Sequence, residues 1–328
     1  MKERMMTGDR VTGKLHLGHY VGSLKNRVAL QHQYDTFVML ADVQALTTHF
    51  KEPKQLSQYL RLVTLDYLSA GIDPNETTIF VQSMIPEIAE LTIYYSMFVT
   101  VNSLRHNPTV KAEALEKGYE DLYYGFLGYP ISQTADITFC KATVVPVGKD
   151  QLPHMEQTRK IIRRFNQLYK PVFAEPRALV GEFPRLPGIN GDSKMSKSKG
   201  NSIHLDSTYE EVLNKIKKAK TDPARVKKSD PGHSERCVIF TYHQAFANES
   251  TEEIYEGCKT ASLGCAECKD KVSKSINQLL EPMRERRDMF QKNPSQLDEI
   301  LMEGTARAQH IAKETLHEVK EAMNMNYF

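Results

Sequence analysis

The sequence contains no tryptophan and only five cysteines among its 328 residues. Four of these cysteines fall between Cys237 and Cys268. Such a small, clustered set does not fit the disulfide framework of a secreted protein. We therefore interpret the cluster as a metal or redox site in a reducing compartment.

Long apolar runs and a strong excess of charge are also missing. No stretch approaches the roughly 18 apolar residues of a membrane span, and the opening MKERMMTGDR lacks the apolar core of a signal peptide. With 43 Lys plus Arg against 41 Asp plus Glu, the formal charge of +2 excludes binding of nucleic acid by bulk charge. The sequence predicts a folded cytoplasmic protein whose polyanion sites, if present, are local.

Short apolar runs alternate with helical patterns through the first half of the chain. We expect strands near 5–7, 35–42, 77–83 and 143–148, and helices from about 16 and over 53–71, 87–101 and 131–138. This alternation predicts an α/β, Rossmann-like fold, a parallel sheet with helices on both faces. Ligands of such sheets bind at the carboxyl ends of the strands.

The second half of the chain has a different pattern. After Lys170 the sequence is rich in Pro and Gly and predicts loop, and from about Asp206 it is helical, with Asp206 or Ser207 as the expected N-cap of the next helix. We expect a domain over 1–190, a lysine-rich loop over 191–205, a smaller all-helical domain over 206–296 and a C-terminal helix over 297–328 that can pack back on the first domain.

Two histidines follow the first predicted strand, in the segment HLGH. His16 and His19 lie three residues apart, so their side chains share one face at the start of a helix. A helix N-terminus offers free N–H groups and a partial positive charge, and two imidazoles beside it suit a triphosphate. The alternative is that both are ordinary polar residues of a helix start.

A second motif, KMSKS, begins at Lys194 and is followed by Lys199 and Gly200. Three ammonium groups on a short polar loop can bind phosphates. A solvated run of charge is the alternative.

In this order, HLGH and KMSKS resemble the two signatures of class I aminoacyl-tRNA synthetases, and VPVGKDQ at 145–151 is similar to a block of the tryptophanyl enzymes. The resemblance covers nearly the whole chain and is strongest to the bacterial tryptophanyl branch. It implies activation of L-tryptophan with ATP to tryptophanyl-adenylate and pyrophosphate, and transfer to tRNA(Trp), by a homodimer. A tyrosyl-type ligase and a non-charging paralogue that binds RNA or senses tryptophan are the alternatives.

The resemblance also implies roles for single residues. His16 and His19 would bind the phosphates, and Lys194 and Lys197 the departing pyrophosphate, with Mg²⁺ as counter-charge. The other expected ATP contacts are Asp9, Arg10, Gly18, Gly148, Asp150, Met195, Ser196 and Ser198. The substrate carboxylate, with a pKa of roughly 3.5, is already ionised at neutral pH, so activation needs no general base.

The expected tryptophan pocket centres on Asp136, the carboxylate that would accept the indole N–H. A buried N–H without an acceptor costs about 1–3 kcal/mol. By positional match, Tyr129 and Gln151 would meet the ammonium or carboxylate of the substrate. The ring would contact Met6, Gly8, Val145 and Val147, together with Gln44 and Gln133, which replace the family's usual histidine and apolar residue.

The cysteines Cys237, Cys258, Cys265 and Cys268 form a C-x20-C-x6-C-x2-C array, whereas Cys140 stands apart and is expected to be buried. Four thiolates suit zinc or an iron–sulfur cluster. Some bacterial tryptophanyl enzymes carry a [4Fe–4S] cluster on a similar pattern near the anticodon, so the resemblance implies that cluster, with zinc or unligated thiols as alternatives. The basic stretch over 214–228 is a candidate contact for tRNA phosphates.

Overall fold

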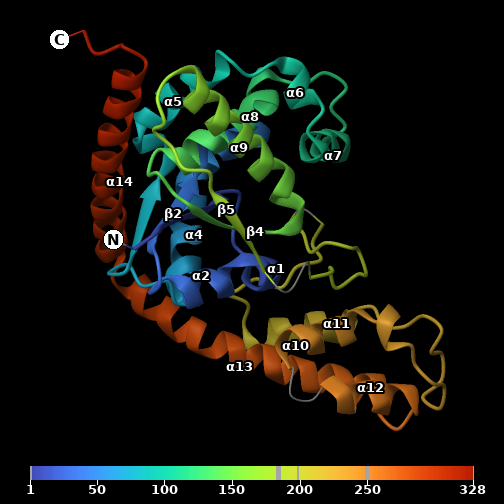
Figure 1. The fold of residues 1–328 in the computed structure, drawn as a ribbon. Coiled ribbons are helices and arrows are strands. Elements are labelled where there is room, and N and C mark those ends of the chain that lie inside the picture. Colours follow the sequence, from blue (N-terminus) through green and yellow to red (C-terminus); the bar gives the residue numbers. More distant parts are fainter. Residues whose placement is uncertain (1, 182–185, 198, 248–250, 328) are drawn as a thin grey trace.

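The computed structural model describes residues 2–181, 186–197, 199–247 and 251–327 (Figure 1). Its centre is a five-stranded sheet in the order β3-β2-β1-β4-β5. The strands are β1 (Arg4–Arg10), β2 (Asp35–Ala41), β3 (Thr77–Val81), β4 (Val144–Val147) and β5 (Arg177–Val180). Neighbouring strands pair in parallel, which confirms the predicted Rossmann-like α/β fold.

Helices follow most of the strands. A π-helical segment, Tyr20–Leu24, joins the first two helices. The helices are α1 (Leu17–His19), α2 (Lys25–Leu30), α3 (Asp42–His49), α4 (Leu56–Ala70), α5 (Pro86–Ser96), α6 (Val101–Arg105), α7 (Pro108–Lys117), α8 (Tyr124–Thr138), α9 (Leu152–Leu168), α10 (Tyr209–Lys218), α11 (Val238–Phe246), α12 (Thr251–Lys259), α13 (Cys265–Lys292) and α14 (Pro294–Ala322).

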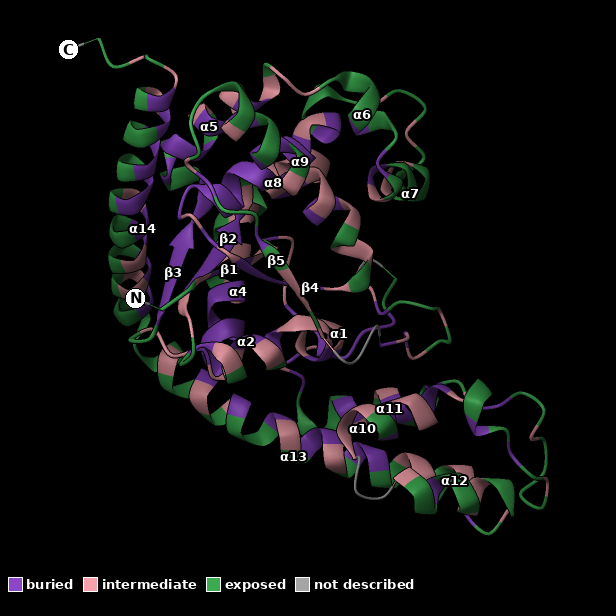
Figure 2. Ribbon diagram, in the orientation of Figure 1, coloured by how far each residue is buried: buried purple, intermediate pink, exposed green. Residues whose placement is uncertain are grey.

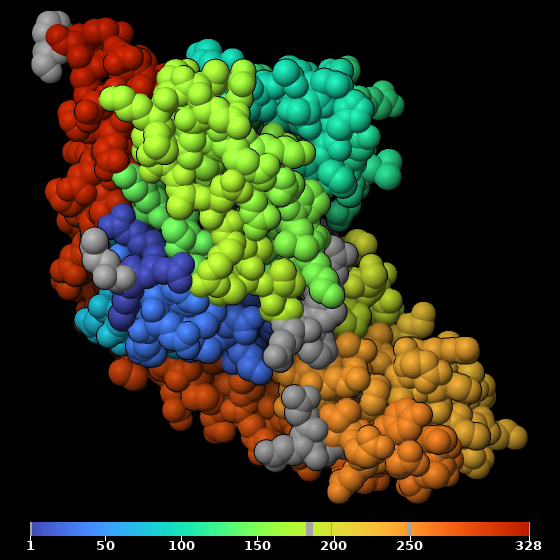
Figure 3. Space-filling view, viewed as in Figure 1, coloured from blue at the N-terminus to red at the C-terminus, as the bar shows by residue number. Residues whose placement is uncertain are grey.

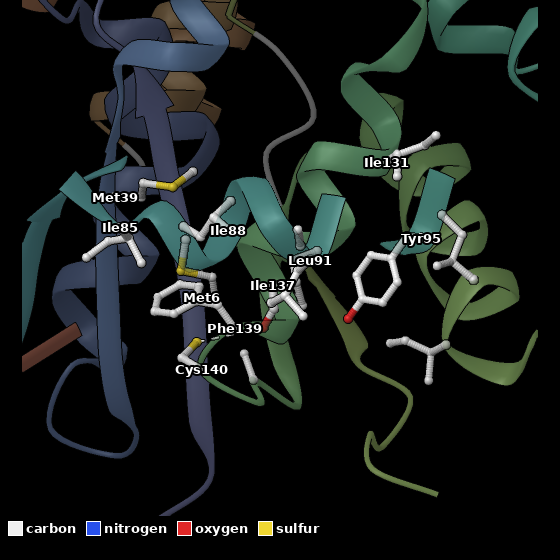
Figure 4. Close-up of a cluster of buried hydrophobic side chains, with 14 of the residues drawn as sticks. Met6, Met39, Ile85, Ile88, Leu91, Tyr95, Ile131, Ile137, Phe139 and Cys140 are labelled. Atoms are coloured by element: carbon white, nitrogen blue, oxygen red, sulfur yellow. Dashed lines mark hydrogen bonds between the residues drawn. The ribbon is translucent and has the colours of Figure 1, made fainter. Parts of the chain in front are cut away.

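The sheet is covered on both faces because its central strands are apolar on both sides. On β2, Phe37 and Met39 join a buried cluster that includes residues of α5, α8 and α9, part of which Figure 4 draws. Their neighbours Val38 and Leu40 join a second cluster with residues of α4 and α13. The alternation places two cores on opposite sides of one sheet, seen as the buried interior in Figure 2.

Several element boundaries differ from the sequence prediction. The expected helix over 87–101 is two helices, α5 and α6, and the one over 131–138 begins earlier because α8 continues through Pro130. The stretch after Lys170, predicted as loop, contains β5. The helix over 53–71 is confirmed as a 3-10 turn, Pro53–Gln55, that leads into α4, and Gly71, whose φ of 105° is left-handed, caps its end.

The N-cap of α10 is Thr208 rather than Asp206 or Ser207. The Thr208 hydroxyl accepts the Glu211 N–H at 3.2 Å, and the Glu211 carboxylate accepts the Thr208 N–H at 2.9 Å. This reciprocal pair, a capping box, decides where the helix starts.

A helical lobe built from α10, α11, α12 and the start of α13 stands beside the sheet domain (Figures 1 and 3). The long helix α13 runs from this lobe to the body of the molecule, and α14 then runs along β3. Arg307 of α14 donates to the Thr78 hydroxyl at 2.6 Å and to Asp35 at 2.7 Å. Among the described residues, no helix has the length and apolarity needed to cross a membrane.

Candidate active site

A cleft of about 440 Å³ opens at the carboxyl ends of the strands. It collects every sequence-predicted ATP or substrate residue except Ser196 and Ser198, of which Ser198 lies outside the described residues. The predicted residues that line it are Met6, Gly8, Asp9, Arg10, His16, Gly18, His19, Gln44, Tyr129, Gln133, Asp136, Val145, Val147, Gly148, Asp150, Gln151, Lys194, Met195 and Lys197.

The two histidines of HLGH cap their own helix. The His16 Nδ1 accepts the Gly18 N–H at 3.1 Å, and the His19 Nδ1 accepts the His16 N–H at 3.2 Å. A neutral imidazole that accepts at Nδ1 carries its proton on Nε2. Helix capping therefore sets the tautomer of both rings.

Both rings are also uncharged near neutral pH. Burial, followed by the neighbouring imidazole and lysines, lowers the pKa of His16 to about 2. Burial is again the largest cause for His19, whose pKa is lowered to about 4 although Asp9 opposes the shift. HLGH therefore supplies two neutral Nε2–H donors to the lining of the cleft.

Asp9, an expected ATP contact, is held in a buried network. Its Oδ2 accepts from Arg27 Nη1 at 2.6 Å and from the Tyr67 hydroxyl at 2.8 Å. Burial alone would raise the pKa of Asp9, but the Arg27 guanidinium holds it well below its usual range. These bonds fix Asp9 and orient Arg27, whose side chain also lines the cleft.

The lysine loop contacts the turn that precedes HLGH. Lys197 Nζ donates to the Gly13 carbonyl at 2.7 Å, and burial lowers the pKa of Lys197 to about 8. Met195 is buried against Gly18, where an added Cβ would lie 3.4 Å from the Met195 Cβ and 2.9 Å from the His16 ring. The two motifs thus touch directly, and Gly18 leaves the room they need.

The last residues of the lysine loop are hydrogen-bonded to the HLGH segment. His16 and His204 form an antiparallel bridge, in which Leu17 N–H donates to the Ile203 carbonyl at 2.9 Å and Leu205 N–H donates to the Leu15 carbonyl at 3.1 Å. The two phosphate motifs, although far apart in sequence, are therefore tied together through the backbone.

The expected indole acceptor lies deep in the cleft. Asp136 is 4% exposed, and its Oδ1 accepts from Gln82 Nε2 at 2.8 Å. Burial raises the pKa of Asp136 to about 7. The hydrogen bond from Gln82 lowers this pKa, and the nearby charge of Asp42 raises it further. The carboxyl group can accept a further hydrogen bond from a ring N–H.

Tyr129, the expected contact of the substrate ammonium or carboxylate, belongs to a chain of hydrogen bonds. Asn107 Oδ1 accepts the Thr109 N–H at 3.0 Å, so its amide nitrogen faces His154 Nδ1, 3.3 Å away. The His154 Nε2–H then donates to the Tyr129 hydroxyl at 2.9 Å. The Tyr129 hydroxyl then donates to the Glu113 carboxylate, which, after burial, raises the pKa of Tyr129.

Gly8 admits a close backbone approach that no other residue would, and Gly148 leaves room for a neighbouring side chain. A Cβ on Gly8 would lie 2.5 Å from the Met39 carbonyl oxygen, and one on Gly148 would lie 2.7 Å from Asp150 Oδ1. The first lets β1 approach β2 where the cleft begins, and the second leaves the Asp150 carboxylate at the cleft wall.

Comparison with known proteins matches residues 2–281 to the model of class I tRNA synthetases for tryptophan and tyrosine. A tryptophan–tRNA ligase from Clostridium longisporum is 48% identical over all of this chain and 98% of its own length. The chain belongs to the tryptophanyl branch of the class I tRNA synthetases. A second relative, the tryptophan–tRNA ligase of Thermotoga maritima, is 45% identical over 99% of this chain and 100% of its own.

Solved structures of the family agree with the fold. The tryptophanyl-tRNA synthetase of Campylobacter jejuni, in complex with ADP and tryptophan, superposes with a TM-score of 0.84 at 30% identity, over 98% of this chain and 99% of that one. As a member of this family, the chain is an aminoacyl-tRNA ligase that uses ATP, which confirms the sequence prediction.

Sequence reasoning missed three residues that position the predicted ones. Gln82 holds Asp136, Arg27 holds Asp9, and His154, three residues after the VPVGKDQ block, holds Tyr129. The position of Gln82, directly after a buried strand of a parallel sheet, was the available signal.

The four clustered cysteines gather in the helical lobe, but not as an evident metal site. Burial, and then the three other thiols, raises the pKa of Cys268 to about 12, so the four sulfurs lie near one another. Cys258 Sγ accepts from Arg225 at 3.9 Å, and Cys268 Sγ lies 3.4 Å from His243 Nε2. Across the ranges that the structure describes, no group of three or more His, Cys, Asp or Glu is arranged to hold a metal ion. The prediction for Cys237 and Cys265 as further ligands is equally unsupported, whereas Cys140 is buried as expected.

Proposed function

We propose that the chain activates L-tryptophan with ATP, releasing pyrophosphate, and transfers the tryptophanyl group to tRNA(Trp). The observation that carries this proposal is the single cleft that HLGH, KMSKS and Asp136 share. Whole-length identity of 48% to a tryptophan–tRNA ligase supports tryptophan as the amino acid.

In the activation step, the substrate carboxylate attacks the α-phosphorus and the bond to pyrophosphate breaks. Because the nucleophile is already ionised, the protein has to position the reactants and stabilise charge on the phosphates. We assign the Nε2–H groups of His16 and His19 to the phosphates. We assign Lys194 and Lys197 to the negative charge that develops on the departing pyrophosphate. Arg10 and Asp150 line the same cleft.

Magnesium supplies counter-charge to the triphosphate when it is bound. Asp9 is already engaged by Arg27 and Tyr67 and is a poor ligand, whereas Asp150 lines the cleft. The residues of this cleft therefore fit a magnesium ion that is bound mainly by the phosphates of ATP, rather than one that is held by several protein carboxylates.

Amino-acid-dependent ATP–pyrophosphate exchange across a panel of amino acids tests the proposal. We expect exchange with tryptophan and none with tyrosine or phenylalanine. Since the chain has no tryptophan, the fluorescence anisotropy of added tryptophan reports binding without interference. Exchange with tyrosine alone would identify a tyrosyl-type ligase, and binding without exchange would identify a sensing paralogue.

The four cysteines carry a separate proposal, that they ligate a [4Fe–4S] cluster. Its support is the shared neighbourhood of the four thiols, which come from the starts of α11 and α13 and from α12, and the free state of these cysteines, which form no disulfide in the part of the chain that the structure describes. Iron, sulfide and zinc content after anaerobic purification decides among a cluster, zinc and free thiols.

We further propose that two copies of the chain associate through α5 and α6. Ile93 of α5 and Met97, which caps the C-terminus of that helix, are 50% and 71% exposed, and Val101, which opens α6, is 56% exposed. Apolar side chains of this size in one patch are typical of an interface between copies. In sedimentation measurements we expect Met97→Lys to give monomers, whereas Val226→Lys, at the 84% exposed Val226 of the lobe, should remain dimeric.

The helical lobe over 206–296 is proposed to meet the anticodon arm, and 1–190 to hold the adenylate. Lys217, Lys218, Lys220, Lys227 and Lys228 are all exposed in the lobe, where they can reach phosphates. Replacing one phosphate-contacting lysine by alanine should reduce the salt dependence of tRNA binding by about one unit of slope and leave ATP–pyrophosphate exchange unchanged. We also propose a cytoplasmic location, which cell fractionation tests.

A further inference from the structure

Gln82 occupies a buried position directly behind the proposed indole acceptor. It follows the last residue of β3, is 2% exposed, and does not appear among the described residues that line the cleft. Any effect of Gln82 on a substrate must therefore pass through the cleft residues that it bonds, the side chain of Asp136 and the backbone of Gln44.

The orientation of the Gln82 amide is fixed by its other partner. Gln82 Oε1 accepts the backbone N–H of Gln44 at 3.0 Å. Because a backbone N–H can only donate, the oxygen end must face Gln44, and the NH₂ group must face Asp136, where it donates at 2.8 Å.

The segment that carries Gln82 is cross-linked to the end of the neighbouring strand. Asp42, directly after β2, accepts the Ser83 N–H at 2.9 Å and the Val43 N–H at 3.0 Å through Oδ1. The Gln82 side chain thus accepts from the backbone that follows β2, and the Asp42 side chain accepts from the backbone that follows β3. This arrangement holds Gln82 before any substrate arrives.

We propose that Gln82 is a positioning residue for amino-acid specificity, which holds the Asp136 carboxylate as an acceptor for the indole N–H. The inference rests on the proposed function. Gln82 donates one hydrogen bond to one oxygen of Asp136, which fixes the carboxylate plane and favours its ionised, acceptor-only form. Burial and Asp42 act in the opposite direction and raise the pKa of Asp136 to about 7. Without the Gln82 donor, a larger share of Asp136 is protonated near neutral pH.

The test compares tryptophan with β-(3-benzothienyl)alanine, in which sulfur replaces the indole N–H. Gln82→Met keeps the length of the side chain but cannot donate. We expect it to raise KM for tryptophan about tenfold or more, to reduce the preference for tryptophan over the thienyl analogue by a similar factor, and to leave KM for ATP unchanged. Thr305→Val is the matched control, because it removes the hydroxyl that accepts the Val81 N–H at 3.3 Å without touching Asp136.

A second variant keeps the proposal testable if Gln82→Met does not fold. Gln82→Glu still accepts from Gln44 but presents a carboxylate to Asp136. Its preference for tryptophan should be low at about pH 8 and recover toward about pH 6, where one proton shared between the carboxyl groups restores a donor. A purely structural role for Gln82 would give no such pH profile.

The outcomes separate this inference from the proposed function. If the unaltered enzyme shows no exchange with tryptophan, the proposed function is wrong. If it does, but Gln82→Met changes KM for tryptophan and ATP alike, or keeps the preference over the thienyl analogue, then Gln82 is not a positioning residue.

Discussion

The buried ion pair between Asp66 of α4 and Arg287 of α13 should dominate the coupling between the helical lobe and the HLGH segment. The two side chains are 0% and 7% exposed, and Arg287 Nη1 donates to Asp66 Oδ1 at 2.6 Å. The second oxygen of Asp66 accepts the Leu15 N–H at 2.7 Å, next to His16. One carboxylate therefore holds both α13 and the start of the phosphate motif.

Arg287→Met leaves that carboxylate buried without its cation. Breaking a buried pair by removing one partner costs about 3–5 kcal/mol of unfolding free energy, because the remaining charge is uncompensated. Burial raises the pKa of Asp66 to about 6 in spite of Arg287, so the full cost is expected at about pH 8. It should shrink as the pH falls through the pKa, because a protonated Asp66 carries no charge.

Urea unfolding followed by circular dichroism measures this cost. Arg61→Met is the control, since the Arg61–Asp298 pair joins α4 to α14 at 2.7 Å but its side chains are 47% and 50% exposed. We expect that control to lose less than about 1 kcal/mol. The double variant Asp66→Asn/Arg287→Met should recover most of the loss, because asparagine still accepts from Leu15 without a charge. Additive losses, or an Arg287→Met cost as small as the control, would refute the reasoning.

Three further predictions concern single residues. The kcat/KM for ATP in pyrophosphate exchange should fall as the pH rises through about 8, where Lys197 loses its proton, and Lys197→Arg should extend activity to higher pH. His16→Asn retains an N-cap acceptor but displaces the Nε2–H, so the thermal midpoint should hold while kcat of activation falls about 10²–10³-fold. Gly304→Ala should lower the unfolding midpoint, since its Cβ would lie 2.0 Å from the Ile79 carbonyl oxygen, whereas Gly128→Ala, with nothing within 4 Å, should not.

The sequence could predict those parts of the site that depend on local sequence patterns. HLGH is a helix start and KMSKS a basic loop, and the parallel sheet brings the ends of β1 and β4 together, so most of the named residues share one cleft. The unpredicted parts depend on contacts between distant segments. Gln82 and Asp136 are 54 residues apart, and neither local sequence indicates that the two side chains form a hydrogen bond. The neutral state of His16 is likewise a result of burial, which a motif does not encode.

The path of α14 has a consequence for the order in which the chain can fold. β3 is an edge strand of the sheet, and α14, which lies along it, comes after the whole helical lobe in the chain. Chains fold from the N-terminus during synthesis, so the sheet domain must wait with β3 uncovered until α14 has been made. Completion of the catalytic domain is thereby coupled to synthesis of the helical lobe, and a product that stops before α14 would keep an exposed apolar edge by which quality control can recognise it.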